Sequence, residues 1–354
     1  MEYRQLGRSG LRVSTLALGT ATFGAKGALG LWGSTDVAGA RRLIDRCVGA
    51  GVNLVDTADA YSSGLSEEIL GEALQGGHAD VLVATKARLR MGDGPNDAGL
   101  SRHHLIEACE ASLRRLRRDH IDLYQVHTWD GQTPLEETLS ALDVLVRSGK
   151  VRYIGCSNFS GWQLMKAAGV ADRRGYEQFV AQQIYLSLQS RDAEHEMMPA
   201  AIDLGVGTLV WSPLAGGLLS GKYRRDVVPE GTARHLGDWH EPPIYYQDQL
   251  YEIVDVIVGI ADARGVPAPQ VALAWLLARP GVTSLIIGAR NEEQLVANLG
   301  AAELELAPEE ADALERVSRR PLPYPLWHQL AGSADRLSAA DESVLGAHLR
   351  GGQG

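Results

Sequence analysis

Short β-branched or apolar runs alternate with amphipathic helical segments from one end of this chain to the other, and no other feature constrains its fold as strongly. The runs predicted as strands cover residues 16–20, 53–56, 81–86, 121–127, 151–157, 179–184, 208–211 and 284–287. The segments between them repeat apolar residues with the period of a helix, as at Leu135, Leu139, Leu142 and Val146. Successive strand–helix units with no break in composition predict a closed (β/α)8 barrel of the α/β class.

An open, doubly wound sheet is the competing α/β architecture for such an alternation. That fold normally carries a GxGxxG loop directly after its first strand. Residues 20–24 instead read Thr-Ala-Thr-Phe-Gly, so the closed (β/α)8 TIM barrel is favoured.

We expect a single barrel domain covering residues 1–354, with an addition at each end. Residues 1–14 predict an N-terminal β-hairpin with a four-residue turn at 7–10. Residues 320–354 form a C-terminal tail that is rich in proline at its start and weakly helical afterwards. The Gly/Pro-rich stretch 212–246 predicts a long loop at the C-terminal face of the barrel.

Capping residues mark the helix starts. Ser34 or Thr35 is predicted to cap the first barrel helix, and Ser101 the third. Thr133 and Glu136 read as a capping box, with Pro134 at the first helical position.

Charge and cysteine content exclude several classes of function. The formal net charge of −10 argues against nucleic acid or an anionic membrane as a partner. The cysteines Cys47, Cys109 and Cys156 are far apart and odd in number, which indicates neither a disulfide framework nor a zinc ribbon. No cluster has metal-ligand spacing, and His103-His104 is expected to lie solvated at a helix start. Without an apolar leader or a run long enough to span a bilayer, the chain is expected to be cytoplasmic.

Polar side chains stand at the ends of the predicted strands, where a barrel places its active site. Because these ends meet at one face, we expect the side chains to share one pocket, with Tyr61 in the loop after the second strand. The strand-end residues are Asp56, Lys86, His127, Ser157, Asn158, Gln183, Trp211, Ser212 and the run Gly288-Ala-Arg290.

Asp56, Tyr61, Lys86 and His127 form a set that can transfer a proton. A free tyrosine has a pKa of about 10, and a neighbouring ammonium lowers it. Lys86 supplies that charge and Asp56 holds it, so Tyr61 is predicted to be a general acid whose pKa lies nearer to neutral, with His127 orienting a carbonyl. Taken singly, Asp56 and Lys86 read as a buried ion pair, Tyr61 as a loop aromatic and His127 as an interior histidine. The four together at consecutive strand ends favour catalysis.

The sequence resembles the aldo-keto reductase family, in particular its bacterial NADP-dependent members. The resemblance rests on motifs that follow in the family's order from about residue 3 to about residue 328. These are Tyr3-Arg-Gln-Leu-Gly-Arg-Ser-Gly-Leu-Arg-Val-Ser14, Leu18-Gly-Thr20, Asp56-Thr-Ala-Asp-Ala-Tyr61 with Gly64, Ser66 and Glu67, Val83-Ala-Thr-Lys86, Asp122-Leu-Tyr-Gln-Val-His127, Gly155-Cys-Ser-Asn-Phe159 and Trp211-Ser-Pro-Leu-Ala-Gly-Gly217.

The resemblance implies reduction of an aldehyde or ketone by hydride from NADPH, with Tyr61 as the acid and Asp56, Lys86 and His127 as its partners. Ser157, Asn158 and Gln183 would bind the nicotinamide carboxamide, and Trp211 would stack on its ring. The remaining residues implied for the cofactor site are Gly19, Thr20, Asp56, Ser212, Pro213, Leu214, Gly216, Lys222, Arg234, Gly288, Arg290, Gln294 and Asn298. Ala297 and Gly288 depart from residues common in NADPH-specific members, which leaves the preference for NADPH resting mainly on Arg290.

Other functions compete with this one. Barrels of the same family also serve as nucleotide-binding β subunits of channels, which would bind cofactor with little turnover. An aldolase or isomerase using Lys86 in a Schiff base is disfavoured, because pairing with Asp56 keeps the lysine charged. Residues 216–222 match GxxxxGK, but Tyr223 replaces the Ser or Thr of a P-loop, so we interpret the run as a backbone cradle for pyrophosphate.

The partner expected is a small-molecule carbonyl compound, and the loops around the mouth would select it. Four tryptophans in those loops predict an apolar or sugar-stacking pocket: Trp32, Trp129, Trp239 and Trp327. Packing between loops is the alternative for Trp32 and Trp327.

Overall fold

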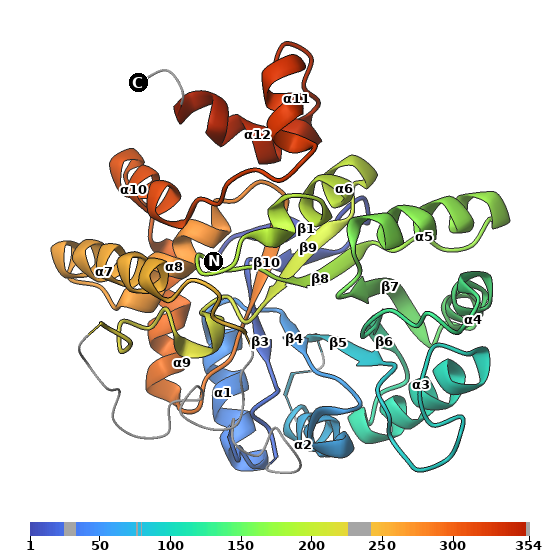
Figure 1. Cartoon of the computed structure of the whole chain (residues 1–354). Coiled ribbons are helices and arrows are strands. Elements are labelled where there is room, and N and C mark those ends of the chain that lie inside the picture. Colours follow the sequence, from blue (N-terminus) through green and yellow to red (C-terminus); the bar gives the residue numbers. More distant parts are fainter. Residues whose placement is uncertain (25–32, 76, 79, 226–241, 352–354) are drawn as a thin grey trace.

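The computed structural model describes residues 1–24, 33–75, 77–78, 80–225 and 242–351. Parallel strands close into a barrel in the order β10-β3-β4-β5-β6-β7-β8-β9 (Figure 1). The closed (β/α)8 barrel predicted from the sequence is therefore confirmed, with strand ends shifted by no more than two residues. The strands are β3 Leu16–Gly19, β4 Leu54–Asp56, β5 Leu82–Ala87, β6 Ile121–Val126, β7 Val151–Ser157, β8 Ala181–Tyr185, β9 Gly207–Trp211 and β10 Val282–Ile287.

Helices surround the barrel, and each connection between neighbouring strands carries at least one of them (Figure 1). The helices are α1 Val37–Gly49, α2 Leu65–Ala73, α3 Arg102–Leu116, α4 Leu135–Arg147, α5 Gly161–Arg174, α6 Met197–Leu204, α7 Gln247–Arg264, α8 Ala268–Leu277, α9 Glu292–Leu299, α10 Pro308–Ser318, α11 Leu326–Gly332 and α12 Ala339–Gly351.

Two of the predicted helix starts are wrong. Helix α1 is capped by Asp36, whose carboxylate accepts from the Gly39 N–H, and not by Ser34 or Thr35. Helix α4 begins at Leu135 after a non-helical Pro134, and the Thr133 hydroxyl donates to the Asp130 carboxylate at 2.6 Å. The N-cap of α4 is Pro134, which has no side chain that can accept from a helix N–H, so the start of α4 has no side-chain cap. The Ser101 cap of α3 is confirmed.

The predicted N-terminal hairpin closes the end of the barrel opposite the carboxyl ends of the strands. Strands β1 Tyr3–Gln5 and β2 Arg12–Ser14 pair antiparallel. Leu6 and Val13 are fully buried in one cluster with barrel-interior residues such as Leu54 and Leu123. The Arg4 guanidinium donates to the carbonyls of Leu277 and Val282, at the start of β10. The hairpin therefore covers the amino ends of the strands, and the candidate site is sought at their carboxyl ends.

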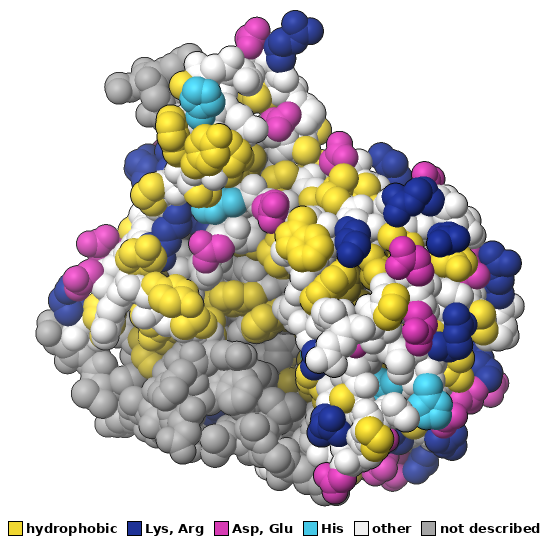
Figure 2. Space-filling view, turned by 45° about the vertical axis from the view of Figure 1, so that its right-hand side comes forward, with side chains coloured by type: hydrophobic (Ala, Val, Ile, Leu, Met, Phe, Trp, Pro, Cys, Tyr) yellow, Lys and Arg dark blue, Asp and Glu magenta, His cyan; other side chains and the backbone are white. Residues whose placement is uncertain are grey.

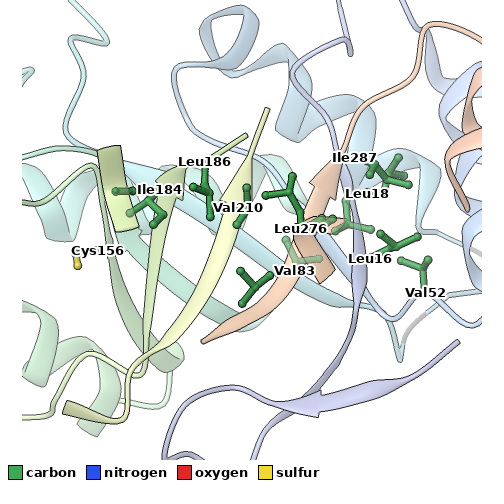
Figure 3. Packing of buried hydrophobic residues seen from close by; sticks show 14 of the residues in the cluster. Leu16, Leu18, Val52, Val83, Cys156, Ile184, Leu186, Val210, Leu276 and Ile287 are labelled. Atoms are coloured by element: carbon green, nitrogen blue, oxygen red, sulfur yellow. The ribbon is translucent and has the colours of Figure 1, made fainter. Parts of the chain in front are cut away.

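A second apolar layer lies between the strands and the helices. Leu16, Leu18, Val83, Val210 and Ile287 belong to it, and Figure 3 shows them together with Leu276 of α8. The three cysteines are buried free thiols, as expected for core positions. His104 is also buried, so the prediction of a solvated His103-His104 pair is wrong for His104, which turns inward from the first turn of α3.

The tail folds into two helices at the edge of the molecule (Figure 1). Helix α12 packs along α6, with Val344 and Leu345 buried. In the part of the chain that the structure describes, no helix is both long and apolar enough to cross a membrane.

Candidate active site

Lys86 occupies the centre of the site. It stands near the end of β5 with its side chain fully buried. Its ammonium donates to Asp56 Oδ1 at 2.6 Å, to the Thr57 carbonyl at 2.8 Å and to the Tyr61 hydroxyl at 3.5 Å. All three N–H groups of Lys86 are thus directed, and the longest of these bonds leads to the tyrosine.

Asp56 is held from several sides at the end of β4. Its Oδ2 accepts from the Gln183 amide at 2.8 Å and from the Gln125 amide at 3.5 Å. The Asp56 backbone carbonyl accepts from the N–H and the hydroxyl of Thr20. Because the carboxylate is nearly inaccessible to solvent and uses both oxygens, its orientation is fixed.

Tyr61 is presented by a strained turn. Ser62 and Ser63, which follow it, have φ values of 50° and 56°, in the left-handed region that favours glycine. The Ser62 hydroxyl donates to the Phe23 carbonyl at 2.9 Å, which helps to hold the turn. Strained backbone of this kind clusters at functional sites, and here it places the Tyr61 hydroxyl beside Lys86.

The protonation states suit Tyr61 as a proton donor. Burial raises the pKa of Tyr61 above its usual value, and the Lys86 ammonium offsets this only in part. The expectation of a pKa lowered toward neutral is therefore wrong, because desolvation of the phenolate outweighs the attraction of the ammonium. Burial also opposes the charge on Lys86, but Asp56 and Tyr61 reverse that effect, so the pKa of Lys86 is raised. A charged Lys86 does not support the Schiff-base reading.

His127 is neutral at physiological pH. Burial, with the nearby charges of Lys86 and Arg88, lowers the pKa of His127 to about 3. Its ring meets the Tyr61 ring edge to face, with centroids 5.9 Å apart. A neutral imidazole can donate a hydrogen bond but holds no extra proton to transfer, so Tyr61 is the better proton-donor candidate of the two.

Four of the residues expected around the nicotinamide lie together at the ends of β7, β8 and β9. The Asn158 amide donates to the His127 carbonyl and to the Ser157 hydroxyl, each at 3.0 Å. The Asn158 amide oxygen accepts from the Trp211 indole at 3.0 Å. Gln183, expected beside them, directs its amide nitrogen to Asp56 instead.

The loop after β9 is folded back on itself. Its N–H groups from Ala215 to Ser220 all donate to carbonyls of the same loop or to the Ser212 hydroxyl. Pro213 is buried, whereas Leu214 and Gly216 are partly exposed and Lys222 is exposed. Within the backbone cradle predicted for residues 216–222, the N–H groups of residues 216–220 are therefore already occupied. Thr20 is also satisfied internally, so its side chain supports Asp56 and does not face the pocket.

The residues expected at the adenosine end come together around the start of α9. The Arg290 N–H donates to the Gln294 side chain at 3.2 Å, and the Asn298 amide lies 3.5 Å from the Gly288 carbonyl. Gly288 is exposed and has open space where a Cβ would stand. Gly19 has no such space, since a Cβ there would lie 2.8 Å from Ile286.

Of the four tryptophans expected at the substrate, Trp129 and Trp327 pack against other aromatic rings, and Trp32 and Trp239 lie outside the described residues. Trp129 packs edge to face against Phe159 and Trp162, at 5.2 Å and 5.5 Å between centroids. Trp327 is exposed on α11 and contacts the rings of Tyr324 and His328. Figure 2 shows hydrophobic side chains gathered on the part of the molecule that projects at the top of the view. The calls on Trp32, Arg234 and Trp239 fall outside the described residues.

Gln125 is a site residue that the sequence reasoning missed. It is fully buried inside the barrel and directs its amide toward Asp56. The signal was present in the alternation of β6, where Leu123 faces the interior and Gln125 and His127 follow at intervals of two. Across the described residues, no group of three or more His, Cys, Asp or Glu side chains is arranged to hold a metal ion.

The comparisons with known proteins agree with this architecture. The sequence profile of the Aldo/keto reductase family matches residues 15–319, and the chain belongs to that family. Over 320 residues it is 42% identical to a Bacillus subtilis (strain 168) protein named "Uncharacterized oxidoreductase YrpG", covering 87% of this chain and 93% of the relative. It is 38% identical to a "Probable voltage-gated potassium channel subunit beta" of Oryza sativa subsp. japonica, covering 90% and 96%. It is 34% identical to the "Versiconal hemiacetal acetate reductase" of Aspergillus parasiticus, covering 89% and 96%.

Proposed function

We propose that this aldo-keto reductase family member reduces an aldehyde or ketone with NADPH, and that Tyr61 is its general acid. The observation that carries the proposal is the buried bond series from Asp56 through Lys86 to the Tyr61 hydroxyl. The edge-to-face position of a neutral His127 supports it, because it leaves one proton donor at the site.

The chain's own residues would act on the carbonyl oxygen of the substrate. Tyr61 gives its hydroxyl proton to that oxygen as the carbonyl becomes an alcohol. Lys86 stabilises the phenolate that remains, and Asp56 keeps Lys86 protonated while the charge develops. His127 can donate a hydrogen bond that orients the carbonyl. When bound, NADPH supplies the hydride for the carbonyl carbon.

The residues around Trp211 fit a nicotinamide ring. The indole is fixed by its bond to Asn158 and by the Tyr185 ring, 5.0 Å away between centroids. A ring held in this way can offer its partly exposed face to a planar ligand. Ser157, Asn158 and Gln183 carry the amide and hydroxyl groups that a carboxamide would pair with.

The 2′-phosphate of NADPH would meet Arg290, since a guanidinium matches phosphate geometry. Gly288, Gln294 and Asn298 surround it at the start of α9. The loop from Ser212 to Lys222, with Pro213, Leu214 and Gly216, would enclose the pyrophosphate only after some of its internal hydrogen bonds open. Slow cofactor association is the expected consequence, because these hydrogen bonds must open first.

A channel-associated regulatory subunit is the second candidate. The observation that favours it is the 38% identity to a relative named as a potassium channel β subunit. The intact set of Asp56, Tyr61, Lys86 and His127 favours turnover instead. A regulatory subunit would oxidise its bound cofactor once and then stop, whereas an enzyme cycles.

The proposal places the protein in the cytoplasm with a small-molecule carbonyl compound as its partner. The buried free thiols Cys47, Cys109 and Cys156 are consistent with a reducing compartment. Aromatic aldehydes, sugar aldehydes and keto-sugars are the substrate classes to test first.

The test is loss of reduced-nicotinamide absorbance with a panel of these carbonyl compounds, using NADPH and NADH in parallel. We expect repeated turnover with NADPH, and Tyr61→Phe should lower kcat by about 10²–10⁴-fold while NADPH still binds. If NADPH binds and is oxidised once per site without further turnover, the regulatory subunit is the better interpretation. Unchanged kcat in Tyr61→Phe would remove the tyrosine from its role.

A further inference from the structure

Asp56 is shared between two parts of the site that have different tasks. Its Oδ1 faces Lys86 and, through the ammonium, the Tyr61 hydroxyl. Its Oδ2 faces Gln183, a residue in the middle of β8 that the proposed function assigns to the nicotinamide carboxamide. One carboxylate therefore lies between the proton donor and the cofactor side of the pocket.

The direction of the Gln183 amide follows from electrostatics. Its nitrogen lies 2.8 Å from Asp56 Oδ2, and an amide oxygen in that place would face the negative charge of the carboxylate. The amide oxygen consequently points away from Asp56, and no donor among the described residues reaches it. It is an acceptor to which a carboxamide N–H could donate while the amide nitrogen keeps its bond to Asp56.

We propose that Gln183 is a positioning residue that links occupancy of the nicotinamide site to the Tyr61 hydroxyl, acting through Asp56 and Lys86. The inference rests on the proposed function, because it takes the cofactor's carboxamide as the ligand of Gln183. A donor at the Gln183 oxygen polarises the amide and strengthens the bond from its nitrogen to Asp56. Asp56 then draws less on Lys86, and the ammonium becomes a better partner for the phenolate of Tyr61.

Two neighbouring residues serve as controls, because one is expected only to bind the carboxamide and the other only to hold Asp56. Ser157 is expected at the same carboxamide, yet its hydroxyl bonds to Asn158 and not to Asp56. Gln125 directs its amide to the same Asp56 oxygen but is fully buried in the barrel. Gln183 alone among these three combines a bond to Asp56 with a place in the nicotinamide group.

The experiment measures ionisation of Tyr61 in the full-length protein, by tyrosinate absorbance relative to Tyr61→Phe, with and without saturating NADPH. NADPH is used because its nicotinamide ring carries no positive charge. In the cofactor-free protein, Gln183→Met and Gln125→Met should both raise the apparent pKa of Tyr61, since Asp56 loses a donor in each. Ser157→Ala should leave it unchanged.

Cofactor binding then distinguishes the variants. NADPH should move the apparent pKa of Tyr61 by the same amount in wild type, Ser157→Ala and Gln125→Met, and by a different amount in Gln183→Met. The affinity for NADPH should fall by about three- to tenfold in both Ser157→Ala and Gln183→Met, so weaker binding alone does not explain the result. Gln183→Leu, with far-UV circular dichroism on all variants, serves as a second variant if Gln183→Met fails to fold, since it also removes the amide without adding a charge.

Two results would overturn the inference. One is a Tyr61 titration in cofactor-free Gln183→Met that equals that of the wild type. The other is an NADPH-induced change that survives intact in Gln183→Met at saturation. If NADPH does not bind any variant, the proposed function fails, while the cofactor-free comparison still decides whether Gln183 acts on Tyr61.

Discussion

Two buried ion clusters in this molecule differ in whether they include a group that can exchange a proton. In one, Lys86 joins Asp56 to Tyr61 at the mouth of the barrel. In the other, Arg191 contacts Glu194 at 2.7 Å and Glu315 at 3.0 Å, in a cluster that links the loop after β8 to α10.

The second cluster is closed. Arg279 contacts the same two glutamates, at 3.1 Å and 3.0 Å, and Arg319 contacts Glu315 at 3.4 Å, so three positive charges face two negative ones. The guanidinium groups of Arg191 and Arg279 lie against the Trp275 ring, within 5.0 Å of its centroid. The first cluster ends instead on a tyrosine that can change its charge. Burial of an ion pair is thus no sign of a site by itself, whereas an ion pair attached to a titratable group at a pocket is one.

Removing the lysine should have the largest effect. Lys86→Met takes the ammonium from both Asp56 and the Tyr61 phenolate, and we expect kcat to fall by about 10²–10⁴-fold. Steady-state rates corrected for the folded fraction, with NADPH and the best carbonyl substrate, provide the measurement. Retained turnover would mean that Tyr61 works without its ammonium.

Removing the arginine should affect stability and spare chemistry. Arg191→Met leaves Glu194 with Arg279 alone, while Glu315 keeps Arg279 and Arg319. Removing this buried partner should lower the free energy of unfolding by about 3–5 kcal/mol at most. The rate per folded molecule should stay within about twofold of the wild-type rate, because Arg191 does not contact the candidate active site. Urea unfolding and initial rates on the same preparations test this. A large loss of kcat would show that the second cluster also contributes to the reaction.

Acid should lower the free energy of unfolding, because His127 beside the first cluster is neutral in the native protein. The folded-state pKa of His127 is about 3 and the ordinary value is 6.5, so between these values the unfolded chain binds a proton that the native protein does not. Stability is therefore lost as pH falls through that window, and the His127 share at pH 5 is about 2 kcal/mol.

The control is His127→Gln, which does not titrate there. Denaturant unfolding at pH 7 and pH 5 should show a smaller acid-induced loss in this variant than in the wild type. Equal losses in the two proteins would mean that His127 is protonated in the native state.

The smallest expected effect concerns the strained turn after Tyr61. Ser63 is exposed and has a left-handed backbone, so Ser63→Gly should raise the free energy of unfolding by about 1 kcal/mol or less. Ser63→Ala keeps the Cβ and should give no gain. Thermal unfolding of the three proteins is the measurement, and equal stabilities of the glycine and alanine variants would show that the turn is unstrained.

Much of the architecture was predictable because it depends on patterns that repeat along the chain. The strand periods gave the closed barrel, and the rule for strand ends brought Asp56, Lys86 and His127 to one face. The cap of α1 at Asp36 and the start of α4 at Leu135 were missed, since neighbouring residues offer rival positions for a helix to begin and a local motif does not choose between them.

The details of the site depended on three-dimensional environment. The pKa of Tyr61 depends on how completely the ring is desolvated, which Lys86 in the sequence does not reveal. The bond from Gln183 to Asp56 joins residues 127 positions apart and follows from closure of the barrel. Gln125 could have been found by extending the inward alternation of β6 back from His127.

The hairpin at the amino end also dictates an order of assembly. Arg4 bonds to carbonyls 273 and 278 positions later in the chain, in the last strand–helix units to be synthesised. During translation Arg4 therefore lacks these two carbonyl partners until residues 277 and 282 have been synthesised. We expect the barrel to close in one late step, with a folding rate limited by these distant contacts. Truncations that stop before β10 should leave the hairpin unpacked.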